Sequence, residues 1–183
     1  FYNKEKSVYF SQPVTYAPYT NSSMHAVFSG CYGIRTGTDS YWSTYKFKKN
    51  QFKTITEYLH DRDYYTSADN LSKILIPKQG FDEFQIHDEL KDDLTLRHSE
   101  LIEKTYTNNK NKNFFLYLQF SNIHATISNE VLRVYDNFSK EYFQNKKLNE
   151  KRYDELFKKS EFYLDKIFEK INSLGLEKNS IIL

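Results

Sequence analysis

The chain contains a single cysteine, Cys31, among its 183 residues. One thiol excludes an internal disulfide and any metal site built from several cysteines. The sequence also has no apolar run near the roughly 20 residues that a membrane-spanning helix needs. We therefore expect no transmembrane segment in this chain.

An excess of charge of one sign is missing as well. The chain has 26 basic and 24 acidic residues, which gives a formal net charge of +2 at pH 7. This balance produces no strong field that would attract nucleic acid. Aromatic residues make up 17% of the chain, but they are scattered along apolar faces instead of forming an RNA-binding signature. We expect no nucleic-acid partner.

Helical and extended patterns alternate along the chain, which predicts an α/β fold with a mostly parallel sheet flanked by helices. The length and the hydrophobic share of 39% allow one sizeable core, so we expect a single domain over 1–183. The expected elements are a helix over Asn50–His60, a strand over Tyr64–Ala68, a polar surface excursion over Gln79–Lys112 with a helical part around His98–Lys104, a strand over Phe114–Phe120, a helix from Asn149 that Gly175 ends, and a buried strand over Ser180–Leu183.

The segment from Tyr19 to Gly37 carries the clearest functional pattern. Side chains of Thr20, Asn21 and Ser22 can cap the free N–H groups of a helix start, and Gly30 can stop that helix. A helix N-terminus attracts anions and would lower the cost of a tetrahedral anion forming on the Thr20 oxygen. Taken alone, Thr20 fits a simple cap, which stabilises a helix by about 1 kcal/mol, better than a nucleophile.

This segment resembles the active-site segment of the sulfatases, a family within the alkaline phosphatase superfamily. Thr20 falls at the position of the nucleophile. The family has Cys or Ser there, oxidised to formylglycine, and Ser22 and Met24 replace the Pro and Arg of its core. The other positions in register are His25, Ala26, Ser29-Gly30 in place of Thr-Gly, Tyr32, Arg35 and Gly37.

Further landmarks of the same family follow in the expected order and cover nearly the whole chain. They are Phe52–Leu59 with Tyr64–Ala68, the Gly80-Phe81-Asp82-Glu83-Phe84 turn, Phe114–Phe120 followed by His124, and Tyr163–Ile167 with Leu174–Leu183. Their joint occurrence carries the resemblance more firmly than any one of them. The fold that it implies is alkaline-phosphatase-like.

The resemblance implies a metal-dependent enzyme with Thr20 as nucleophile and, through the same oxygen, as a metal ligand. The implied cofactor is a divalent cation (Ca, Mg, Mn or Zn) whose other ligands lie mostly outside this chain. His124 and His25 would bind the substrate, a small-molecule, glycan or lipid ester. The family's metal-binding Asp cluster and its Asp-His-Gly motif would fall before and after the given sequence. We therefore expect 1–183 to be a partial sulfatase-like domain, incomplete at both ends.

Three functions remain open at this point. The first is a sulfatase-like hydrolase of sulfate or phosphate esters. The second is a phosphotransferase of the phosphoethanolamine or phosphoglycerol type, because such relatives carry threonine at the nucleophile position. The third is a catalytically inactive binding domain, which the altered core around Met24 suggests.

Each candidate residue also has a structural interpretation. His25 can simply pack within its helix, His124 can be a loop histidine, and Arg35 fits a pairing role better than a substrate contact. The His60-Asp61 and His87-Asp88 pairs show no established metal-ligand spacing, so we interpret both as solvated turns.

Overall fold

The computed structural model describes residues 7–126 and 146–183, which separate into two compact units. The first unit consists of the residues up to Ile86 together with Asn109–Tyr117. The second consists of His87–Asn108 and the residues from Leu118 onward. The chain thus leaves the first unit, returns to it for one strand, and leaves it again.

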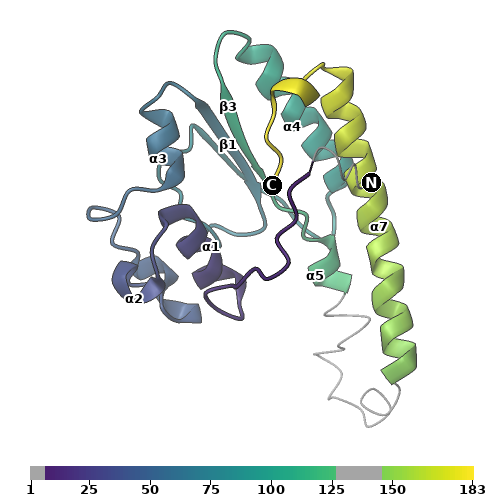
Figure 1. Cartoon of the computed structure of the whole chain (residues 1–183), viewed down its shortest axis with the longest axis horizontal. Helices are drawn as coiled ribbons and strands as arrows, with labels where there is room; N and C mark the ends of the chain where they lie inside the picture. Colours follow the sequence, from purple (N-terminus) through teal and green to yellow (C-terminus); the bar gives the residue numbers. More distant parts are fainter. Residues whose placement is uncertain (1–6, 127–145) are drawn as a thin grey trace. The chain divides into compact units, whose positions relative to one another are not determined.

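A three-stranded parallel sheet organises the first unit (Figure 1). The strands are β1 (Tyr65–Asn70), β2 (Glu83–Ile86) and β3 (Phe114–Leu118), in the spatial order β2-β1-β3. β1 is central and almost fully buried, although its sequence is polar. Parallel strands with helical segments between them confirm the expected α/β class.

The helical elements of the first unit precede the sheet in the chain. They are α1 (Thr20–Ser29), α2 (Gly33–Thr36), the 3-10 helix η2 (Tyr41–Lys46) and α3 (Ile55–His60). α1 ends where Gly30 adopts a left-handed conformation with φ 63°, as the sequence predicts. α3 begins with a capping box, in which Thr54 and Glu57 each accept the other's backbone N–H.

Phe28 of α1 lies at the centre of an aromatic core in the first unit. Its ring centroid is 5.9 Å from that of Phe81, 6.4 Å from Phe115 and 5.4 Å from Tyr117. The fully buried Ala68 of β1 belongs to the same core. Because edge-to-face ring contacts have a preferred geometry, this cluster fixes how α1 packs on the sheet.

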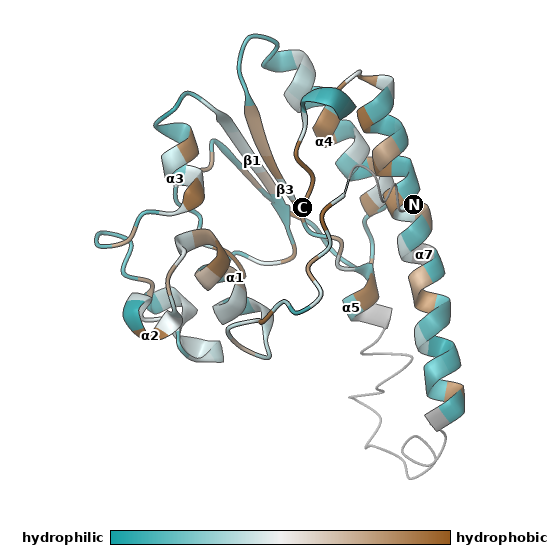
Figure 2. Cartoon of the chain, in the orientation of Figure 1, coloured by the Kyte–Doolittle hydropathy of each residue, from teal (hydrophilic) through white to brown (hydrophobic). Residues whose placement is uncertain are grey.

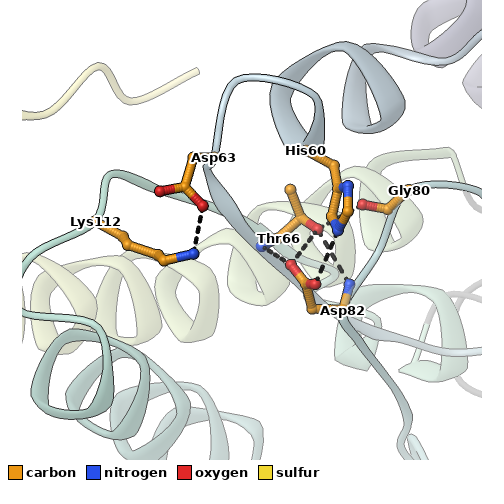
Figure 3. A network of polar contacts seen from close by, with 6 residues as sticks. All are labelled: His60, Asp63, Thr66, Gly80, Asp82 and Lys112. Atoms are coloured by element: carbon orange, nitrogen blue, oxygen red, sulfur yellow. Dashed lines mark hydrogen bonds and ion pairs between the residues drawn. The ribbon is translucent and has the colours of Figure 1, made fainter.

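Asp82 fastens the turn before β2 to β1 (Figure 3). Its Oδ2 accepts hydrogen bonds from Thr66 N at 2.8 Å and Thr66 Oγ1 at 3.0 Å, and its own N–H donates to Thr66 O at 2.9 Å. Its Oδ1 lies 3.3 Å from Nε2 of His60. These contacts set the register in which Ser67 is paired with Glu83.

Gly80 occupies a position in this turn that a side chain cannot share. Its φ is +77°, and a Cβ there would collide with the backbone of Thr56 and Glu57. Its carbonyl accepts a hydrogen bond from Thr66 Oγ1 at 2.5 Å (Figure 3). The Gly80-Phe81-Asp82 landmark therefore has a structural function, which is to join the start of β2 to β1 and α3.

The second unit is helical, and α4 packs along α7 within it (Figure 1). Its elements are α4 (Leu94–Asn108), α5 (Asn122–Thr126), α7 (Lys146–Ser173) and the 3-10 helix η4 (Glu177–Asn179). Figure 2 shows apolar bands along α7 between polar stretches. The buried apolar side chains of α4 and α7 are Leu94, Leu101, Ile102, Leu156, Tyr163 and Ile167.

Two elements differ from the sequence prediction. The strand β2 falls inside the stretch predicted to be a surface excursion. The sequence pattern did not indicate this strand, because its short sequence contains only two apolar residues. The strand predicted over Ser180–Leu183 is wrong: these residues lie outside any sheet of the described structure, and Ile181 is 91% exposed. An apolar run becomes a strand only where a neighbouring strand supplies ladder hydrogen bonds.

None of the helices in the described ranges 7–126 and 146–183 is long and apolar enough to cross a membrane.

Candidate active site

Thr20 is the first residue of α1 and is exposed to solvent. Tyr19 precedes it in an extended conformation, and no side chain caps the helix start. The first N–H groups of a helix have no intrahelical partner, and here no N-cap side chain supplies one. The structure therefore places the Thr20 hydroxyl beside the positive end of a helix of 10 residues.

The residues that follow Thr20 anchor the helix start. Asn21 and Ser22 are buried, and they donate hydrogen bonds to the carbonyl oxygens of Tyr41 at 3.2 Å and Ser40 at 3.4 Å. Both acceptors lie at the beginning of η2, so α1 and η2 are held together. Thr20 itself is left at the surface of a fixed backbone.

Ser23 secures the chain that leads into α1. Its Oγ donates to Ala17 O at 2.7 Å and accepts from Ala17 N at 3.2 Å. It also lies 2.8 Å from the hydroxyl of Thr15. These three contacts of the Ser23 hydroxyl hold the irregular segment around Thr15 and Ala17 in place. No strand precedes Thr20 within residues 7–19.

His25 lies on a different face of α1 from Thr20, because residues five apart are separated by about 140° around a helix. It is 3% exposed, and its Nε2 is 3.3 Å from Ile74 O. Its ring also makes an edge contact with Phe47 at 5.3 Å. Burial lowers the pKa of His25 below its usual value, and the bond to the Ile74 carbonyl opposes this shift. Its Nδ1 has no hydrogen-bond partner among the described residues.

His25 lines a pocket of about 240 Å³ in the first unit, together with three lysines. The lysines are Lys49, Lys73 and Lys78. The described residues that line this pocket include no carboxylate, so its charge favours an anion. The remaining lining residues are Thr44, Tyr45, Phe47, Ile74, Ile76, Pro77 and Gln79.

His124 belongs to the second unit, where it lies on the short helix α5 after β3. Its side chain is 68% exposed, and its Nδ1 is 3.1 Å from Glu89 Oε2. The position beyond a strand agrees with the sequence prediction. Glu89 orients the imidazole and leaves its Nε2 edge available to solvent.

The sequence did not indicate a buried polar cluster in the second unit. His87 is 3% exposed, and its Nε2 lies 2.7 Å from Ser121 Oγ. His98 is fully buried, with its Nδ1 2.6 Å from the hydroxyl of Tyr163. The two imidazole centroids are 6.1 Å apart. The prediction that His87 lies in a solvated turn is therefore wrong, because the neighbouring acidic residues concealed its burial.

The described residues of each unit offer few candidate metal ligands close to one another. In the described residues of either unit taken alone, no three His, Cys, Asp or Glu side chains gather closely enough to hold an ion. The exposed Thr20 hydroxyl is a hard oxygen donor of the kind that Mg²⁺ and Ca²⁺ accept. Its chemistry fits one position in the coordination shell of such a cation.

Comparison with known proteins identifies one family. A family model described as Sulfatase matches residues 2–183, nearly the entire chain. No curated protein matches the chain significantly.

Proposed function

The chain belongs to the sulfatase family of the alkaline phosphatase superfamily, and from this premise we propose that it hydrolyses sulfate or phosphate esters with Thr20 as the nucleophile. The family match supports a sulfatase-like hydrolase, and members of the family generally use a divalent metal ion. The assignment of Thr20 is our own. It rests on one observation, an exposed hydroxyl on the first residue of an anchored helix that no side chain caps.

The reaction begins when Thr20 Oγ attacks the phosphorus or sulfur atom in line with the leaving oxygen. The bond from Oγ forms, the bond to the leaving alcohol breaks, and the threonine proton passes to solvent. Water or an acceptor alcohol then attacks the covalent ester and restores the Thr20 hydroxyl. The N–H groups at the start of α1 stabilise charge that develops on the transferred group.

A divalent cation would be held in part by the Thr20 oxygen. When bound, the cation would lower the pKa of the Thr20 hydroxyl and would polarise an oxygen of the ester.

We assign substrate binding to one histidine of each unit, His25 in the first and His124 in the second. Together with Lys49 and Lys73, His25 lines an anion-favouring pocket, and this supports an assignment to substrate binding. His124 presents an imidazole that Glu89 orients, which suits a hydrogen bond to a charged ester oxygen. Both assignments are proposals that depend on Thr20 being the nucleophile.

The methyl group of Thr20 favours a phosphate ester over a sulfate ester as the substrate. For this reason a phosphotransferase is the second candidate function. Oxidation of a threonine side chain would give a ketone, whereas the formylglycine route needs an aldehyde from Cys or Ser. A covalent ester on Thr20 must therefore be released by attack on phosphorus or sulfur. An acceptor alcohol can perform this step in place of water, and the ester is then transferred instead of hydrolysed.

The first test replaces Thr20 in the full-length protein. With Mg²⁺, Mn²⁺, Ca²⁺ or Zn²⁺ added, we expect Thr20→Ala to lower turnover of a chromogenic ester by at least about 1,000-fold and Thr20→Ser to retain part of it. Thr107→Ala, which removes another exposed hydroxyl, serves as the matched control. Activity of a folded, metal-loaded Thr20→Ala variant near that of the parent would reduce Thr20 to a helix residue.

Substrate choice separates the remaining candidates. Faster turnover of bis(4-nitrophenyl) phosphate than of 4-nitrophenyl sulfate would support the hypothesis of a phosphate ester substrate. Mass spectrometry of quenched enzyme should then find a phosphoryl group on Thr20. Acceleration by added glycerol, with a glycerol phosphodiester as product, would identify a transferase. Failure to turn over either substrate, with no metal bound, would favour an inactive binding domain.

A further inference from the structure

The 3-10 helix η2 has an inverted arrangement of polar and aromatic residues. Ser43 and Thr44 are buried, at 5% and 4% exposed. In contrast, Trp42 is 73% exposed and Tyr45 is 74% exposed. Water-soluble surfaces more often show the opposite order, and this helix instead presents aromatic rings to the solvent.

Backbone geometry explains how the two rings share one face. A 3-10 helix has three residues per turn, so Trp42 and Tyr45 lie one above the other. The inward side chain of Ser43 is fixed by hydrogen bonds from Ser40 N and to Ser40 O, both at 2.9 Å. The outward position of the rings is therefore built into the local structure.

Positively charged residues follow these rings closely in the sequence. From Ser40 to Thr56 the sequence contains four lysines and no acidic residue. Lys46 and Lys49 are exposed, and Lys48 donates to Arg35 O at 3.1 Å. We name Tyr41, Trp42, Tyr45, Lys46 and Lys49 the aromatic-basic surface.

We propose that the aromatic-basic surface docks on an anionic lipid bilayer. Tryptophan and tyrosine rings favour the headgroup level, where one edge is apolar and the other is hydrated. Neighbouring lysines gain from the negative potential of the lipid surface. A protein partner fits less well, because lysine is depleted from protein interfaces. A neutral glycan would stack on the rings but would gain nothing from the positive charge beside them.

Trp42 supplies an internal probe, since it is the only tryptophan in the chain. Vesicles containing about 30% anionic lipid should shift its emission to shorter wavelength and expose it to quenching by brominated lipid tails. Purely zwitterionic vesicles should do so weakly. Salt at about 0.5 M should reduce binding to the anionic vesicles, because the lysines act through a screened field.

Sedimentation with the same vesicles tests the residues. The Lys46→Gln, Lys49→Gln double variant and the Trp42→Ala, Tyr45→Ala double variant should each lower the partition coefficient roughly tenfold or more. Tyr58→Ala and Lys151→Gln provide controls, because they remove an exposed ring and an exposed charge from other elements.

Three results would overturn the proposal. These are no emission shift with anionic vesicles, equal binding to neutral vesicles, or losses no larger than those of the control variants. An emission shift with soluble oligosaccharide but not with vesicles would assign the surface to a glycan instead. The wild-type salt titration remains decisive even if a double variant loses its fold.

Discussion

At the scale of single residues, His25 links burial to pH dependence. The folded state disfavours its protonated form, because burial lowers its pKa below the ordinary value of 6.5. The unfolded chain takes up a proton near pH 6.5 that the folded chain does not. The contribution of neutral His25 to the free energy of unfolding is therefore fully present above pH 6.5. It is lost as pH falls through the folded-state pKa.

We expect His25→Gln to flatten the dependence of unfolding free energy on pH between neutral and mildly acid conditions. The measurement is urea denaturation at several pH values from 7.5 downward. A parent slope that His25→Gln does not alter would contradict the burial argument.

Tyr117 has the opposite dependence at alkaline pH. Burial raises its pKa from 10.0 to about 12. The unfolded chain ionises first, so stability is present below pH 10 and is lost as pH rises toward 12. The expected loss is on the order of 2 kcal/mol. Tyr117→Phe should reduce it in alkaline denaturation curves, and an unchanged curve would show that the ring is not desolvated as the structure indicates.

At the scale of elements, the turn before β2 depends on space at Gly80. A Cβ at this position meets the backbone of Thr56 and Glu57, and φ is positive. Gly175 has a similar φ of +69°, but a Cβ there meets nothing within 4 Å. The two glycines therefore separate the effect of crowding from that of conformational strain.

We expect Gly80→Ala to lower the free energy of unfolding by about 3 kcal/mol or more and Gly175→Ala by about 1 kcal/mol. Thermal or urea denaturation of both variants measures the difference. Equal losses would mean that α3 moves away from the turn at little cost.

Asp82 in the same turn gives a second prediction at this scale. Asp82→Asn replaces the carboxylate that accepts two hydrogen bonds from Thr66. One amide oxygen cannot serve both Thr66 and His60 as the carboxylate does, so we expect a loss of about 1 to 3 kcal/mol. Asp63→Asn, whose ion pair with Lys112 is exposed, should cost under about 1 kcal/mol (Figure 3). Comparable losses for both variants would show that the Asp82 contacts stabilise the fold no more than an exposed ion pair does.

At the scale of the whole molecule, we propose that 1–183 folds as one domain even though its contacts form two compact units. The reason is connectivity. β3 joins the sheet of the first unit only after the chain has passed through His87–Asn108 of the second. Trp42 fluorescence reports on the first unit, and circular dichroism at 222 nm is dominated by the long helices of the second. We expect coincident urea transitions for both signals, whereas separate midpoints would show two independently folding units.

The sequence by itself determined the elements that depend on local pattern. Apolar residues at three- and four-residue spacing predict α7, and Gly175 ends its helical stretch as expected. The strand Phe114–Leu118 follows from an unbroken apolar run, and Gly30 marks the end of α1. The family resemblance, carried by ordered landmarks, is confirmed by the match over residues 2–183.

Only the tertiary structure decided which polar residues are buried and what they contact. His87 and His98 looked like surface residues, yet they are buried against Ser121 and Tyr163, which follow much later in the chain. The apolar run at Ser180–Leu183 was predicted as a strand but lies outside any sheet of the described residues. Periodicity reports the face that a residue prefers, whereas burial and strand pairing depend on partners distant in sequence, and no local pattern contains that information.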